Sequence, residues 1–220
     1  METFIANNRA ELIARCKAKV AQRPTRGATS EQLDNGIPVF LEQLRRTLVA
    51  EKKGHVALSL AISGASKGDA DVPSEMGVTA AAHGKQLMEL GYTVDQVVHD
   101  YGDVCQSITD LAVERDAPFE VDQFRTLNRC LDNVIADAVT EFSLQRDATV
   151  ARKHADNVEE RLRFLAHEQS IAMETAMHAV TPIEAGNLPI SGATGGVLKR
   201  NLYVLKKLID DTLQEVPIKT

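Results

Sequence analysis

Apolar residues recur at intervals of three and four along most of the chain, and no segment alternates convincingly between apolar and polar residues. This spacing predicts helices rather than strands, so we expect an all-α fold. The first predicted helix runs from about Thr3 to Val20. The second begins at Thr29 or Ser30 and extends to about Leu48, with an irregular first turn. A long exposed loop is then expected over residues 63–77, where Gly, Ser and Asp are frequent.

Two further helices complete the predicted N-terminal domain. One spans about Val78 to Leu90 and ends at Gly91, which has the identity and position of a residue just past a helix C-terminus. Thr93 opens the next helix, which ends before Pro118. Together these four helices predict a compact helical bundle, to which we assign residues 1–120.

A single long helix is expected to follow, because no proline or glycine occurs between Asp122 and about Val180. Its first part carries apolar residues at heptad spacing, namely Phe124, Leu127, Leu131, Val134 and Ala138. Residues 143–160 are nearly all polar. We therefore interpret residues 121–158 as a signalling helix, a coiled-coil-like linker.

The C-terminal residues 159–216 predict an αα-hairpin. One arm ends near Val180, the connection covers residues 181–194, and the return arm carries Val197, Leu198, Leu202, Leu205, Leu208, Ile209 and Leu213. Two helices alone cannot bury both apolar stripes, so the hairpin should pair with a second copy in a dimeric four-helix bundle. The sequence therefore predicts a homodimer.

Composition narrows the functional classes. The chain has 25 basic and 31 acidic residues, a formal net charge of −6, which argues against nucleic acid or an anionic membrane as a partner. No apolar run approaches the roughly 18 residues that span a bilayer, so a cytoplasmic protein is expected. Cys16, Cys105 and Cys130 are odd in number and widely spaced, so we interpret them as buried apolar residues rather than a disulfide framework.

The main candidate for chemistry is His167, with Glu168 beside it in the chain. The apolar spacing places His167 on the flank of its helix. An exposed imidazole next to a carboxylate can serve as a nucleophile, because the carboxylate orients the ring and leaves one nitrogen lone pair free. Spacing alone equally fits a solvated histidine.

The run Phe164-Leu165-Ala166-His167-Glu168 resembles the H-box of bacterial sensor histidine kinases. Residues 160–213 as a whole are similar to the dimerisation and histidine-phosphotransfer hairpin of that family. The resemblance implies that His167 is the phosphoacceptor and that Glu168 is the acidic neighbour that assists phosphotransfer.

The chain departs from the family pattern directly after the H-box. Gln169 to Ala172 replace the usual Leu-Arg-Thr/Asn-Pro, so the proline that bends the family's helix is missing. Ile171 stands where the family has a Thr or Asn that orients water, and an alkyl group cannot hydrogen-bond water. Phosphatase activity is therefore not part of the expectation.

A second resemblance concerns the N-terminal domain. The run from Gly91 to Tyr101, with glycine and an aromatic residue ahead of spaced hydrophobic residues and a tyrosine, is similar to the helical input domain of RsbR-type co-antagonists of the bacterial stress response. It implies a cytoplasmic sensory domain. Only Gln214 to Thr220 follow the hairpin, so we expect the family's ATP-binding catalytic domain to be missing from this chain. Either the natural protein extends beyond Thr220, which the abrupt end of the sequence favours, or the chain depends on a kinase domain in trans.

These observations combine into one functional hypothesis. The chain is expected to be the sensory and phosphoacceptor part of a protein histidine kinase in a two-component system, inactive alone. ATP is the phosphodonor, presented by the missing domain, and the phosphate passes from His167 to an aspartate of a response-regulator receiver domain. The alternative is a non-catalytic dimeric scaffold of a stress-response pathway. No bound metal or cofactor is predicted, and Asp95, His99 and Asp103, at four-residue spacing, are expected to form a solvated stripe.

Overall fold

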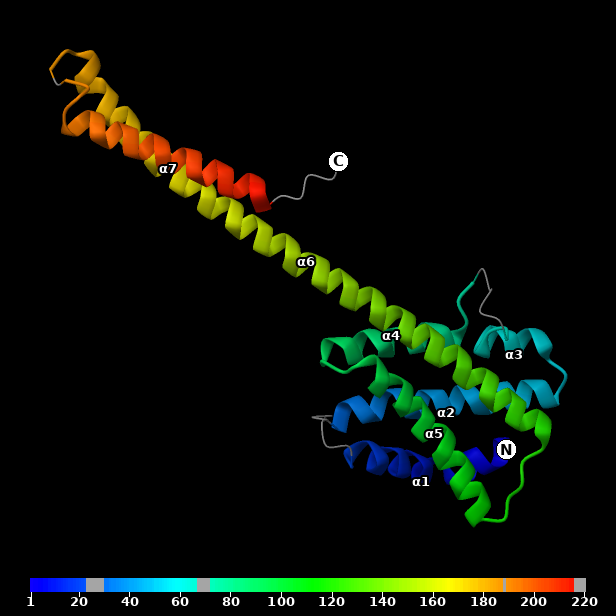
Figure 1. Ribbon diagram of the computed structural model, residues 1–220. Coiled ribbons are helices and arrows are strands. Elements are labelled where there is room, and N and C mark those ends of the chain that lie inside the picture. The colour runs from blue at the N-terminus through cyan, green and yellow to red at the C-terminus, as the bar shows by residue number, and fades with distance from the viewer. Residues whose placement is uncertain (23–29, 67–71, 188, 216–220) are drawn as a thin grey trace. The chain divides into compact units, whose positions relative to one another are not determined.

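The fold of the chain is helical in a computed structural model that describes residues 1–22, 30–66, 72–187 and 189–215 (Figure 1). Its helices are α1 Glu2–Ala21, α2 Ser30–Lys52, α3 Val56–Ser63, α4 Glu75–Glu89, α5 Val94–Glu114, α6 Val121–Glu184 and α7 Ala193–Glu215. The described residues include no strand, which confirms the all-α prediction. The chain divides into two compact units, Met1–Thr149 (unit 1) and Val150–Thr220 (unit 2).

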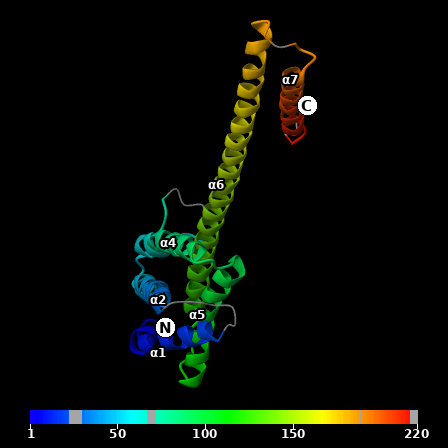
Figure 2. The same ribbon diagram turned by 90° about the vertical axis from the view of Figure 1, so that its left-hand side faces the viewer.

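Unit 1 is built around one hydrophobic core to which α1 to α5 and the first part of α6 contribute. Figure 2 shows α1, α2, α4 and α5 gathered beside the first part of α6. Helix α5 shows why the sequence folds this way. Its core residues Val97, Tyr101, Val104, Ile108 and Leu111 are all buried and follow one another at intervals of three or four. This spacing keeps one face of a helix continuously apolar, and burial of that face is the main stabilisation available to a surface helix.

The first part of α6 belongs to this core. Leu127, Cys130, Leu131, Val134 and Ala138 are at most 6% exposed. Four of the five residues of the predicted heptad stripe are thus covered by helices of their own unit, whereas Phe124 at its start is 41% exposed. A stripe of this width fits any neighbouring helix, so its period does not identify the neighbour. The compact division accordingly falls after Thr149, whereas the sequence places residues 121–158 in a linker.

The junction between α4 and α5 forms as the sequence predicts. Gly91 adopts a positive φ of 78°, and its N–H donates to the carbonyl of Met88 while the N–H of Tyr92 donates to that of Leu87. These two bonds satisfy carbonyls that the helix end leaves open, and glycine takes this conformation without a Cβ clash. Thr93 then caps α5, exchanging side-chain and backbone hydrogen bonds with Gln96.

The region between α2 and α4 departs from the sequence prediction. Helix α3, at Val56–Ser63, is not predicted, because its short and mostly apolar sequence has no polar face to define a period. Helix α4 begins at Glu75 rather than Val78, because the Ser74 hydroxyl accepts a hydrogen bond of 3.0 Å from the N–H of Gly77. The predicted loop is therefore shorter at both ends, and residues 67–71 lie outside the described structure.

Unit 2 consists of the last part of α6 and α7, which runs back alongside it (Figures 1 and 2). Helix α6 continues to Glu184, past Pro182, and α7 begins at Ala193, so the connection is shorter than the predicted residues 181–194. The buried apolar residues described here are few, namely Ala172, Ala176, Ala179 and Leu205. In the described parts of the chain, no helix combines the length and the apolar character needed to cross a bilayer.

The three cysteines carry no disulfide, and Cys16 and Cys130 are buried while Cys105 is half-buried. Burial raises the pKa of Cys130 to about 12 and also raises that of Cys105. Because the thiolate is the reactive form, a raised pKa lowers reactivity at neutral pH. We expect an aromatic disulfide reagent at pH 8 to label Cys105 first, and Cys16 and Cys130 only after unfolding, as followed by mass spectrometry. Labelling of Cys130 at the rate of Cys105 would contradict this.

Candidate functional site

His167 lies on the last part of α6, and its side chain is exposed. The face of α6 that packs against α7 carries Ala172, Ala176 and Ala179, which are buried. His167 is on the opposite side of the helix from these alanines. Residues three before and four after a helical position share its face, and here they are Phe164 and Ile171, 62% and 47% exposed. The imidazole is therefore accessible and flanked by exposed apolar side chains.

Glu168 does not share this face. Consecutive residues of a helix point about 100° apart, and Glu168 is half-buried on the side toward α7. No hydrogen bond or ion pair joins the described side chains of His167 and Glu168. The structure thus places the two residues of the H-box-like run next to each other in the chain without bringing the carboxylate to the ring.

A cation lies one turn before His167. Arg163 forms an ion pair of 2.6 Å with Glu159, and both side chains are largely exposed. Exposed pairs of this kind contribute little stability, so the guanidinium is free to change partner at small cost. A phosphoryl group on His167 would be a stronger partner for the Arg163 guanidinium than Glu159 is, because guanidinium binds phosphate oxygens with paired hydrogen bonds.

Unit 2 also exposes a second apolar surface. On α6, Met173 and Met177 directly follow the buried Ala172 and Ala176, and both are more than half exposed. On α7, Leu202 and Ile209 directly follow half-buried inward positions and are about half exposed. In an antiparallel pair, residues that directly follow the inward positions of both helices emerge on the same side. We call Leu162, Met173, Met177, Leu202 and Ile209 the apolar face of unit 2.

Comparisons of this chain with protein-family models, curated proteins and solved structures found no significant match. The geometry of the residues is therefore the basis for a functional assignment.

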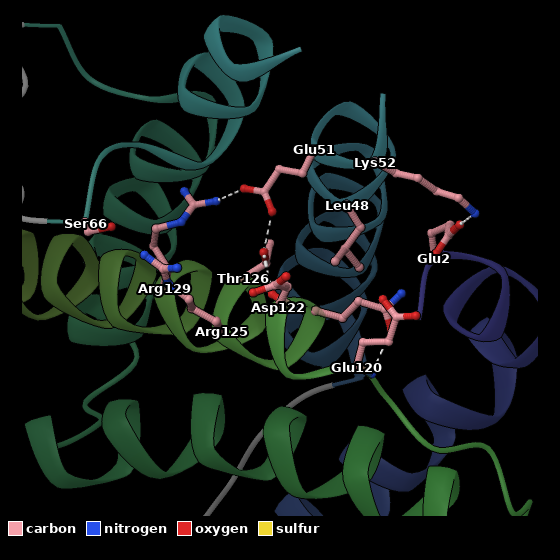
Figure 3. A pocket seen from close by; sticks show the side chains of 11 residues that line it. Glu2, Leu48, Glu51, Lys52, Ser66, Glu120, Asp122, Arg125, Thr126 and Arg129 are labelled. Carbon is pink, nitrogen blue, oxygen red and sulfur yellow. Dashed lines mark hydrogen bonds and ion pairs between the residues drawn. The ribbon is translucent and has the colours of Figure 1, made fainter. Parts of the chain in front are cut away.

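Unit 1 contains a polar cavity of about 540 Å³ where α2 ends and α6 begins (Figure 3). Arg129 pairs with Glu51 and donates to the Ser63 hydroxyl at 2.6 Å and the Gly64 carbonyl at 2.8 Å. Lys52 pairs with Glu2 at 2.6 Å, and Glu2 has a lowered pKa mainly because of this hydrogen bond. These two ion pairs account for four of the seven charged side chains that line the cavity. The bonds of Arg129 join α6 to α2 and to the end of α3.

The predicted solvated stripe on α5 needs a correction. Asp95 and His99 are exposed, as expected, and His99 Nε2 lies 3.4 Å from Asp95 Oδ1. Asp103, in contrast, is buried. Asp103 lies two residues past Tyr101 and one before Val104, so the inward face of α5 is wider than the apolar spacing suggests. In the part of the chain that the structure describes, no group of three or more His, Cys, Asp or Glu side chains is arranged to hold a metal ion.

Sequence reasoning expected unburied apolar residues on the hairpin, but it missed the apolar residues beside His167 and a cavity in unit 1 beside His83. The residues beside His167 have a signal in the sequence. Phe164 and Ile171 are apolar residues outside the inward stripe, and such an excess indicates a second contact face. The cavity leaves no such signal, because it depends on how side chains from four helices pack.

Proposed function

We propose that this chain is the sensory and phosphoacceptor part of a cytoplasmic two-component histidine kinase, with His167 as the residue that receives the phosphate. The observation that carries the proposal is the exposed imidazole of His167 between the exposed Phe164 and Ile171. A nitrogen nucleophile must be reached by a phosphodonor, and a partner domain that presents ATP needs an apolar surface on which to dock. Both are present on one face of α6.

The chemistry requires little beyond access. An imidazole nitrogen attacks the γ-phosphorus of ATP, the bond to the bridging oxygen breaks, and ADP leaves with its electron pair. The proton displaced from the imidazole passes to solvent or to a base, and a phosphoramidate remains on His167. Arg163, one turn away, is placed to neutralise part of the added charge. An aspartate carboxylate of a response-regulator receiver domain then attacks the same phosphorus and restores the imidazole.

A homodimer is part of the proposal. The apolar face of unit 2 belongs to a pair of helices whose described buried core is mainly three alanines and Leu205. Two copies that meet through this face would cover both stripes in a four-helix bundle. His167 points away from α7, and at about 100° per residue it lies about 120° around the helix from Met173 and about 80° from Met177, so such a dimer leaves it accessible.

The decisive experiment is phosphorylation with γ-labelled ATP and an ATP-binding catalytic domain of a sensor histidine kinase supplied in trans. We expect acid-labile, base-stable label on the wild-type chain and none on His167→Gln. The matched control is His178→Gln, because His178 is also exposed and lies on nearly the same face of α6 about three turns later. Circular dichroism confirms that each variant keeps its helices. Equal label on His167→Gln would exclude His167 as the phosphoacceptor.

The second candidate function is a non-catalytic dimeric scaffold. It is favoured by the orientation of Glu168 toward α7, which leaves His167 without a carboxylate to orient its ring. A scaffold would use the apolar face of unit 2 for assembly and would tolerate His167→Gln. Absence of label on a wild-type chain that is folded and dimeric would favour this function over phosphotransfer.

A further inference from the structure

A cavity of about 210 Å³ lies in unit 1 where α2, α4, α5 and α6 meet. Its walls are largely apolar and include Phe40 from α2, Ala80 from α4 and Val134 from α6. Roughly 150 Å³ is enough for benzene in an apolar protein cavity. The cavity therefore has room for a molecule with about one six-membered ring.

Two ring side chains with polar groups line this cavity. Tyr101 is 8% exposed and His83 is half-buried, and each faces the cavity. Their rings meet edge to face, with centroids 6.3 Å apart. Among the described residues, neither the Tyr101 hydroxyl nor a ring nitrogen of His83 forms a hydrogen bond. Both groups open into the cavity, so the polar group of a bound molecule can replace water as their hydrogen-bond partner.

The backbone of α2 makes room for this arrangement. A Cβ atom on Gly36 would lie 3.0 Å from Cε1 and 3.1 Å from Nε2 of His83. Only a residue without a side chain lets the imidazole lie this close to α2. His83 is thereby kept against the cavity wall, with its ring beside Tyr101.

The electrostatics favour an uncharged molecule. Burial lowers the pKa of His83, so its imidazole is neutral at pH 7. Burial, Asp100 and Asp137 raise the pKa of Tyr101, so its hydroxyl stays protonated. The same two carboxylates disfavour an anionic molecule nearby. A neutral hydroxyl is the group that fits, because it can donate to an imidazole nitrogen and accept from the Tyr101 hydroxyl.

We propose that this cavity is a binding site for a small, uncharged, single-ring molecule that carries a hydroxyl group, held by His83 and Tyr101. Val134 places the bound molecule against α6, the helix that also carries His167. A role of this site in sensing rests on the proposed function, whereas binding of the molecule does not depend on it.

The test compares phenol with toluene, which has nearly the same shape but no hydroxyl. Each is titrated into the full-length chain, and NMR signals of Ala80 and Val134 report occupancy. We expect phenol to bind about tenfold more tightly than toluene, the contribution of a hydrogen-bonded hydroxyl. In Tyr101→Phe, and more fully in a double variant with His83→Phe, this preference disappears while toluene still binds.

Toluene binding shows that the cavity of each variant is intact, so loss of the phenol preference cannot be misfolding. An unchanged preference in the double variant would overturn the proposal, as would absence of binding by both compounds to the wild-type chain. Since no step involves ATP or His167, this result is independent of the outcome of the phosphorylation experiment.

Discussion

Gly84→Ala is expected to be strongly destabilising, although alanine is the better helix former. Gly84 lies in α4 against α6, where a Cβ atom would stand 2.1 Å from the carbonyl oxygen of Ala138 and 2.8 Å from its carbon. Backbone atoms cannot rotate away as a side chain does, so the two helices must separate. That separation disturbs the core around Leu87, Val134 and Ala138. We expect the free energy of unfolding of unit 1 to fall by about 3 kcal/mol or more.

The matched control is Gly102→Ala, in the interior of α5. A Cβ atom there meets nothing within 4 Å, so the substitution should increase stability by about 0.5–1 kcal/mol through helix propensity and a more restricted unfolded chain. Urea unfolding followed by tyrosine fluorescence measures both variants. A Tyr203→Phe background leaves only Tyr92 and Tyr101, both in unit 1, as reporters. Equal stability of the two alanine variants would show that α4 and α6 do not approach as described.

The second large effect is expected from Leu202→Glu on the apolar face of unit 2. In a dimer formed through this face, the two-fold symmetry brings two new carboxylates into the interface, one from each copy. Burial of charges without partners, close to their own copies, costs several kcal/mol. A cost of about 3 kcal/mol corresponds to a dissociation constant raised more than 100-fold. Sedimentation velocity over a range of concentrations should then show the wild-type chain as a dimer and the variant as a monomer.

Tyr203→Glu is the natural control for this experiment. Tyr203 is the next residue of α7 and is exposed, but it lies away from both α7's inward stripe and the apolar face. The Tyr203→Glu variant should therefore dimerise like the wild-type chain. Met173→Glu tests the same face from α6 and should behave like Leu202→Glu. A monomeric wild-type chain, or a dimer unaffected by Leu202→Glu, would argue against assembly through this surface.

The sequence predicts the helical elements best where capping chemistry and spacing agree. Gly91 and Thr93 place the junction of α4 and α5 to the residue, because each satisfies open backbone groups in a way few residues can. Helix α3 escapes prediction, since Val56–Ser63 has too few polar residues to show which side is buried. The start of α4 is missed for a simpler reason: Ser74 is hidden among other loop-forming residues.

The candidate site divides in the same way. The exposure of His167 follows from helical spacing, and so does its separation from Glu168, once adjacency in the chain is distinguished from adjacency on a helix face. The cavity beside His83 could not be anticipated. It requires Gly36, His83 and Tyr101 to meet from three helices, and no periodicity within one helix records such a meeting.

Between the buried Phe142 and the half-buried Leu165, α6 has a continuous run of exposed residues from 146 to 164. At 1.5 Å per residue this run is about 28 Å long. Within the single chain, its helix is maintained by good helix formers and by local pairs such as Glu159 and Arg163 rather than by a core. Its backbone should therefore open far more readily than that of α5, with fast amide exchange in the run while both flanking stretches stay protected. A rotation of the helix at one end of this run reaches the other end only through consecutive backbone hydrogen bonds. One turn in which those hydrogen bonds are broken would therefore uncouple the two ends.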